Sequence, residues 1–202
     1  SLLHHLKKGV RGEIPENPDV SDPVFQKTFN VIVGNNRMAL EAAAARAEKE
    51  GCDCIIDEDL LCFDVEAAAE YIVKKALSAS ESRKQEKPLC LLFGGETTVR
   101  VKGGGTGGRN QHLALLCARL LRRHPGITVL CGGTDGTDGP TEAAGAVIDS
   151  STWRDAIMNR IDPQWYIENY DSFNFFREAG GLIITGPTFT NVMDLIVVIC
   201  QK

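Results

Sequence analysis

The sequence predicts an α/β fold with three layers, in which helices cover both faces of a mainly parallel sheet. A mixed sheet is the alternative. Two observations support this class: short apolar runs typical of buried strands alternate with amphipathic helical patterns, and 43% of the residues are hydrophobic, enough for a sizeable core. We expect residues 1–28 to be an irregular linker and residues 29–202 to form the α/β domain.

The composition limits the classes of partner. A net charge of −5 argues against non-specific nucleic-acid binding, and no apolar run approaches the roughly 20 residues that span a bilayer. The polar start, SLLHHLKKG, does not resemble a secretory signal, and the seven cysteines include no CxxC pair. We therefore expect a reducing compartment, either the cytoplasm or the mitochondrion, and no nucleic-acid or membrane partner. The sequence allows a homodimer.

The first regular elements are expected from Phe29 onward. FNVIVG predicts a buried strand, Asn35 or Asn36 can cap the helix that follows, and Gly51 ends that helix after Glu50. CDCIID predicts the next strand. Asp64 caps a second helix over VEAAAEYIVKKAL, and residues 78–88 form an exposed connection.

The second half continues the alternation. PLCLLFGG predicts a strand and TTVRV a second strand paired tightly with it; a helix then runs from Asn110 to about His124. GITVLCGG predicts another buried strand. After the short apolar stretch 143–148, residues 152–178 form two or three short helices that Pro163 interrupts. GLIIT and DLIVVIC are the last strands.

Thirteen of the twenty glycines lie between Gly94 and Gly145, which suggests that backbone approaches a ligand there. GxGxxG is present, but no acid lies between Gly108 and Asp135 to bind a ribose, and no Walker lysine follows. What remains is a loop that presents amides at a helix N-terminus, typical of an anion site. The expected contacts are Gly94, Gly95, Glu96, Thr97, Gly104, Gly105, Gly107, Gly108 and Asn110.

Arg109 opens the helix after this loop, where the helix dipole disfavours a cation. A bound anion would reverse that effect, so an anion contact is the preferred interpretation. The alternative is that Arg109 forms a salt bridge with Glu96 or an aspartate and only shapes the loop.

Two further loops carry polar side chains. In GGTDGTDGPTEAAGA, Asp135 or Asp138 can hold Mg²⁺, orient a substrate hydroxyl or act as a base; simple turn chemistry is the alternative. In TGPTFTN, Thr188 and Asn191 suit phosphate or hydroxyl contacts, although a structural turn explains them nearly as well. His112 is expected to be half-exposed on its helix.

The three motifs, in this order, resemble the C-terminal part of the class II glycerate kinases, the group with a MOFRL domain. The resemblance is close over residues 88–202. It implies transfer of the γ-phosphate of ATP, with Mg²⁺, to D-glycerate, giving 2-phosphoglycerate. It also implies that most of the family's N-terminal domain, with its active-site lysine, is absent, so that this chain alone is inactive.

The resemblance places Arg109 on the substrate or phosphate and the Asp135–Asp138 loop at the cleft. Family members commonly have Glu where this chain has His112. Two alternatives stay open: an NAD(P)H-dependent hydroxypyruvate reductase, since relatives have carried that label, and a non-catalytic module that binds an anion.

Overall fold

The structure is a computed structural model that describes residues 1–15, 17–82 and 87–201, apart from the side chain of Ser82. The chain divides into two units, Ser1–Val33 and Gly34–Lys202, which are described separately.

The first unit contains two short helical segments, α1 (Leu2–Val10) and the 3-10 helix η1 (Pro23–Lys27). The expectation of an irregular stretch over residues 1–28 is therefore wrong for α1. The predicted strand after it is also wrong: residues 29–33 have no regular secondary structure, and Phe29 is 91% exposed. A strand needs a hydrogen-bonded neighbour, and none of the described residues of this unit provides one.

The second unit is built on one six-stranded sheet with the order β1-β2-β6-β3-β4-β5. Its strands are β1 (Asp53–Ile56), β2 (Leu89–Gly95), β3 (Ile127–Gly133), β4 (Gly145–Asp149), β5 (Leu182–Ile183) and β6 (Asp194–Cys200). The α/β class is confirmed and the sheet is mixed. The mainly parallel pairing is corrected, because only β1 and β2 are parallel and the other four pairs are antiparallel.

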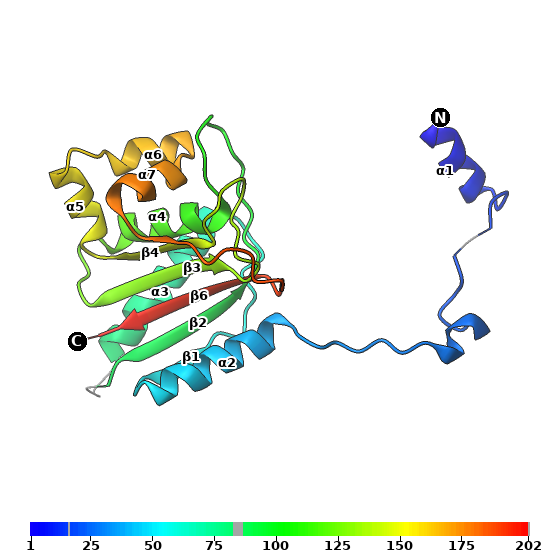
Figure 1. Ribbon diagram of the computed structural model, residues 1–202, viewed down its shortest axis with the longest axis horizontal. Coiled ribbons are helices and arrows are strands. Elements are labelled where there is room, and N and C mark those ends of the chain that lie inside the picture. The colour runs from blue at the N-terminus through cyan, green and yellow to red at the C-terminus, as the bar shows by residue number, and fades with distance from the viewer. Residues whose placement is uncertain (16, 83–86, 202) are drawn as a thin grey trace. The chain divides into compact units, whose positions relative to one another are not determined.

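The helices make the outer layers. They are α2 (Asn36–Lys49), α3 (Val65–Ser82), α4 (Arg109–Leu121), α5 (Thr152–Met158), α6 (Pro163–Asn169) and α7 (Ser172–Ala179). α3 and α4 pack on one face of the sheet in the larger core cluster, and α2 packs on the other face in a smaller one (Figure 1). The three-layer arrangement is therefore confirmed.

Local signals set most of the boundaries. The Asn35 side chain accepts the Met38 amide at the start of α2, and Gly51, with φ of 86°, follows its end. The Asp64 carboxylate accepts the Glu66 amide at the start of α3. α3 continues to Ser82, beyond its predicted end, and residues 83–86 of the expected connection lie outside the described residues.

The second strand predicted over TTVRV is absent. Only an isolated bridge between Asp64 and Thr98 forms there, and the rest of this segment is irregular. Its place beside β2 is taken by β6, which pairs with β2 along its whole length. Alternation in a sequence of five residues does not by itself distinguish a strand from an irregular segment.

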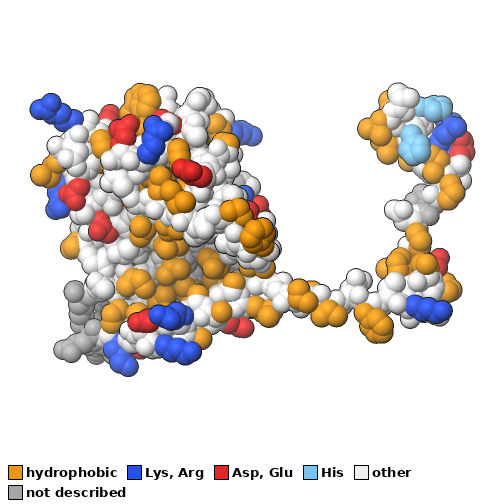
Figure 2. All heavy atoms as spheres, viewed as in Figure 1, with side chains coloured by type: hydrophobic (Ala, Val, Ile, Leu, Met, Phe, Trp, Pro, Cys, Tyr) orange, Lys and Arg blue, Asp and Glu red, His pale blue; other side chains and the backbone are white. Residues whose placement is uncertain are grey.

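The two faces of the sheet are covered unequally. α4 is buried along most of its length between the sheet and the C-terminal helices. On the opposite face, α2 covers β1 and β2, and apolar side chains remain visible beside it (Figure 2). Half-buried Leu130, Val147 and Val197 belong to strands on this side. None of the described helices is both long and apolar enough to cross a membrane.

Candidate functional site

The predicted motifs meet at one end of the sheet, where β2 and β3 end and β6 begins. Asp194, the first residue of β6, pairs in register with Gly95 on one side and Gly133 on the other. Because neither neighbour has a side chain, space is left beside the Asp194 carboxylate. The Arg109 side chain reaches into this space from the start of α4.

Arg109 forms a bidentate ion pair with Asp194. Its Nε donates to Asp194 Oδ2 at 2.6 Å and its Nη2 donates to Oδ1 at 3.0 Å, while Nη1 lies 3.1 Å from Glu96 Oε1. The Asp194 side chain is only 2% exposed. Hydrogen bonding to Asp194 raises the pKa of Arg109 above its usual range, so the guanidinium stays charged.

The salt bridge predicted as the alternative role of Arg109 is therefore present, with Glu96 and with an aspartate not singled out from the sequence. These contacts do not occupy all the N–H donors of the Arg109 side chain. A guanidinium has five N–H donors, and three contacts leave donors for a further acceptor.

Asp138 occupies the N-terminus of α4, where an anion was predicted. Its carboxylate accepts the amides of Asn110 at 3.0 Å and Gln111 at 2.8 Å, and the Gln111 side-chain amide at 3.0 Å. The residue is 3% exposed, and burial raises its pKa. A carboxylate held in this way has little capacity left for a metal ion, so its position favours a helix cap over a ligand.

The glycines of the loop before α4 mostly adjoin protein. A Cβ on Gly103 would lie 2.3 Å from the Asn169 carbonyl oxygen, and one on Gly105 would lie 2.4 Å from Asp171 Cβ. Gly107 and Gly108 are similarly close to Ser172 and Asp138, and Gly94 to Asn36. Only Gly104 of this loop has open space around it. The close approach inferred from glycine is real, but most of it is an approach to helices α6 and α7.

A cleft of about 730 Å³ lies in front of Arg109. Gly107, Gly108, Glu96 and Thr97 line it together with Arg109. Within the described ranges, the backbone amides of Gly107, Gly108 and Arg109 have no hydrogen-bond partner. Three free amides and a permanent cation at a helix N-terminus can bind negatively charged oxygens.

The loop that contains Asp135 and the loop that contains Thr188 contact each other at this end of the sheet. The Thr188 amide donates to the Asp135 carbonyl at 3.1 Å, and the Thr188 hydroxyl donates to the Thr134 carbonyl. Asn191 accepts the Met193 amide in a local turn. Thr188 and Asn191 thus hold the loop in place, while Asp135 keeps a half-buried side chain whose Oδ1 accepts the Thr137 amide at 3.0 Å.

The carboxylates gather around Gly133. A Cβ on Gly133 would lie 3.0 Å from Asp135 Oδ1 and 3.6 Å from Asp194 Oδ1. Among the described residues, no group of three or more His, Cys, Asp or Glu side chains could hold a metal ion alone. The Asp135 carboxylate is not occupied by the amides of α4, and its role as a metal ligand stays a prediction.

Sequence reasoning missed the role of Asp194. The available signal was a charged residue at the first position of the apolar run DLIVVIC, immediately after a polar loop. An acid next to an apolar strand is costly to bury unless it is paired, but the sequence does not show which cation pairs with it.

His112 is also placed differently from the prediction. It is 3% exposed, rather than half-exposed, and its ring stacks on Tyr170 with centroids 4.9 Å apart. Burial, with a smaller effect of Arg119, lowers the pKa of His112 to about 4, so the imidazole is neutral at pH 7.

Residues 89–194 match the model of the MOFRL family. Over 167 residues the chain is 41% identical to a D-glycerate 2-kinase of Thermotoga maritima, covering 82% of this chain and 40% of the relative. It is 34% identical to a glycerate 2-kinase of Pyrococcus horikoshii, covering 98% of this chain and 45% of the relative. The chain thus spans less than half the length of these two relatives.

The fold is also similar to that of a solved glycerate kinase. The crystal structure of a glycerate kinase from Thermotoga maritima superposes with a TM-score of 0.81 at 37% identity. The superposition covers 96% of this chain and 49% of that structure.

Proposed function

The chain belongs to the MOFRL family, and from this premise we propose that the protein is a glycerate kinase. It would transfer the γ-phosphate of ATP to the 2-hydroxyl of D-glycerate, giving 2-phosphoglycerate. The observation that carries the proposal is the cleft in which Arg109 and three free amides meet at the start of α4. The choice of D-glycerate as the substrate rests on the chain's similarity to relatives named D-glycerate 2-kinase and glycerate 2-kinase.

Phosphoryl transfer is catalysed mainly by positioning the reactants and neutralising charge. Arg109, fixed by its ion pair with Asp194, would direct its remaining donors at negative oxygens of the phosphate or of the glycerate carboxylate. The amides of Gly107 and Gly108 would bind further oxygens without reorganisation, because the packing of the loop already fixes them. Gly94, Gly95 and Asn110 would act indirectly, through the shape of this wall.

Mg²⁺ would enter with the nucleotide. Such an ion is usually held by phosphate oxygens and one or two carboxylates, so a complete protein cage is not required. Asp135 fits this role better than Asp138, because its side chain is half-buried and the helix amides do not occupy it. When bound, the ion would neutralise charge on the phosphates.

The test is an assay of the full-length protein that carries this chain. We expect ADP release that requires D-glycerate, and a phosphorus NMR signal of 2-phosphoglycerate rather than the 3-phosphate. Oxidation of NADH by hydroxypyruvate without ATP would replace the proposal with a reductase. Phosphate binding without turnover of any of these substrates would leave only an anion-binding module.

Arg109→Lys separates charge from geometry in this assay. Lysine keeps the charge near Asp194 but cannot form the two-pronged pair, so we expect kcat to fall by about 10²-fold or more. Arg154→Lys, an exposed residue of α5, is the matched control and should leave kcat unchanged. Normal turnover by Arg109→Lys would remove Arg109 from the mechanism.

A further inference from the structure

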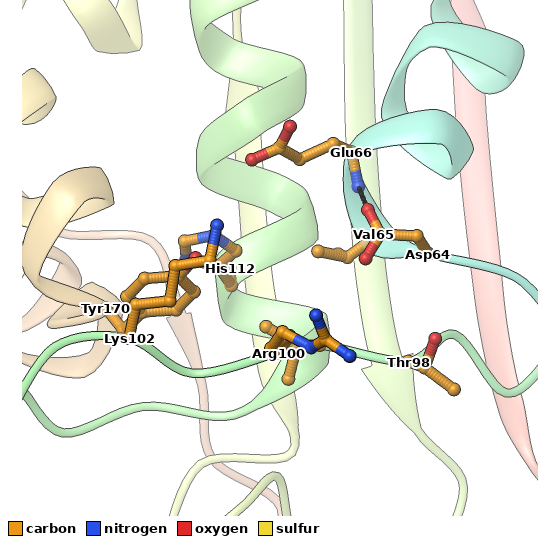
Figure 3. A pocket seen from close by; sticks show the side chains of 9 residues that line it. Asp64, Val65, Glu66, Thr98, Arg100, Lys102, His112 and Tyr170 are labelled. Atoms are coloured by element: carbon orange, nitrogen blue, oxygen red, sulfur yellow. Dashed lines mark hydrogen bonds between the residues drawn. The ribbon is translucent and has the colours of Figure 1, made fainter.

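A second pocket, which we call the His112 pocket, adjoins the cleft. It has a volume of about 510 Å³, and Thr98 and Val99 line both cavities. Figure 3 shows its side chains, which come from the start of α3, the segment 98–102, α4 and the end of α6. The pocket is within the size range of small-ligand sites, about 300–1,000 Å³.

Unpaired charged groups surround the pocket. Arg100 and Lys102 come from the segment before the glycine loop, and Glu66 comes from the first turn of α3 (Figure 3). In the part of the chain that the structure describes, none of these three side chains has an ion-pair or hydrogen-bond partner. Asp64 differs, because one of its oxygens accepts the Glu66 amide. The pocket thus offers two cations and one free carboxylate.

A flat aromatic pair forms another part of the wall. The rings of His112 and Tyr170 are nearly parallel, with an interplanar angle of 10°. The Nδ1 atom of His112 is buried and has no hydrogen-bond partner among the described residues. Because this atom is closed to solvent, the surface that the pair offers to a ligand is its flat aromatic wall, to which half-buried Tyr170 contributes.

We propose that the His112 pocket binds the nucleoside part of ATP. The proposal rests on the proposed kinase function and assigns a place to the base and ribose. The base packs against the ring of Tyr170, while the ribose hydroxyls donate to Glu66. Arg100 and Lys102 contact the phosphates, which continue past Thr98 and Val99 towards Arg109.

Three features favour a nucleoside over a simple anion. An aromatic wall binds a planar base by stacking, whereas an anion gains nothing from it. A free carboxylate would repel an anion but accepts hydroxyl or amino donors. The cleft contains free amides suited to phosphate, and it shares the lining residues Thr98 and Val99 with the pocket.

The test measures adenosine binding by calorimetry with the full-length protein. Tyr170→Asn removes the ring but suits the backbone, because Tyr170 has a φ of 56° and Asn tolerates this left-handed conformation. We expect adenosine to bind about tenfold more weakly, and tripolyphosphate to bind within twofold of the wild type. Trp165→Asn removes an exposed ring from the same helix and should change neither affinity.

Two surface variants test the other half of the pocket. Arg100→Ala and Lys102→Ala should weaken tripolyphosphate binding severalfold and leave adenosine binding unchanged. In steady-state kinetics, Tyr170→Asn should raise KM for ATP about tenfold and leave KM for D-glycerate unaltered.

The outcomes separate the two proposals. Unchanged adenosine affinity in Tyr170→Asn, or a changed KM for D-glycerate instead of ATP, overturns the pocket assignment even if the kinase activity is present. Adenosine binding that depends on Tyr170, in a protein that does not phosphorylate D-glycerate, supports the pocket and overturns the proposed function.

Discussion

Asp138 caps the N-terminus of α4 from a distant loop. The first residues of α4 have no acidic side chain of their own, and the N-cap position is Gly108, which has no side chain to cap with. Asp138, 28 residues further along the chain, supplies the acceptor for Asn110. The cap therefore joins the two glycine-rich loops, and its loss would destabilise both of them.

Asp138→Asn should destabilise the protein by about 2 kcal/mol, because a neutral amide accepts fewer of the helix N–H groups and leaves the others buried. Urea denaturation measures this change. Asp162→Asn is the matched control: Asp162 caps the exposed start of α6, where Asn is an equally good cap. Equal effects of the two substitutions would contradict the special role of Asp138.

His112 predicts a specific dependence of stability on pH. Its folded pKa of about 4 lies below its ordinary value of 6.5, so the unfolded chain binds more protons between these two values. Stability is then fully present above pH 6.5 and falls as the pH drops towards 4, by about 2 kcal/mol between pH 7 and pH 5.

Urea denaturation at pH 7 and pH 5 tests this dependence. His112→Gln should remove that part of the pH dependence, whereas His124→Gln, at an exposed position after α4, should retain it. An identical pH dependence in both variants would mean that His112 does not cause the loss.

At the scale of elements, the loop before α4 is part of the packing of α6 and α7. The Gly105 amide donates to the Asn169 carbonyl, and the Thr106 amide donates to the Asp171 carboxylate at 2.7 Å. The loop can therefore present the amides of Gly107 and Gly108 in fixed positions without a ligand. This rigidity explains why so many glycines are needed where few of them face the cleft.

Two neighbouring glycines give a sharp test of this interpretation. Gly105→Ala should destabilise the protein by about 1–3 kcal/mol, because the new methyl would overlap Asn169 and Asp171. Gly104→Ala has open space and should change stability by less than about 1 kcal/mol. Thermal denaturation distinguishes the two, and a similar loss in both would show that backbone freedom, rather than packing, requires these glycines.

The sequence predicted elements whose signals are local. Asn35 or Asn36 and Asp64 were expected to cap helices, and Asn35 and Asp64 accept amides at the starts of α2 and α3. Pro163 was expected to interrupt the helical stretch 152–178, and α6 begins there, separate from α5. What could not be predicted depends on contacts between distant segments. The insertion of β6 between β2 and β3, and with it the Arg109–Asp194 pair, joins residues 85 positions apart. The roles of Arg109 and Asp135 in catalysis stay predictions.

The whole molecule divides into units of very different character. None of the described residues of Ser1–Val33 is buried, whereas both core clusters and all six strands belong to Gly34–Lys202. Phe29, Val31 and Ile32 are 75% exposed or more. The second unit therefore contains the interactions that stabilise a folded domain.

A chain that begins at Gly34 should unfold at nearly the same temperature as the 202-residue chain, within about 2 °C, because no buried apolar surface is removed. Differential scanning calorimetry of both chains measures this. Deleting β6 instead should abolish the cooperative transition, since this strand pairs with two others in the centre of the sheet. A large loss of stability in the shorter chain would show that the first 33 residues contribute to the core.

The glycines on either side of Asp194 also affect how the chain finds its correct strand alignment. A shift of β6 by two residues would keep its apolar side chains on the same faces, so burial alone discriminates weakly against it. The shift would, however, remove the Asp194 carboxylate from Arg109 and place a bulky side chain between Gly95 and Gly133. The ion pair thus disfavours wrong alignments of the central strand, and a protein that folds with such an alignment would also lack the proposed anion site.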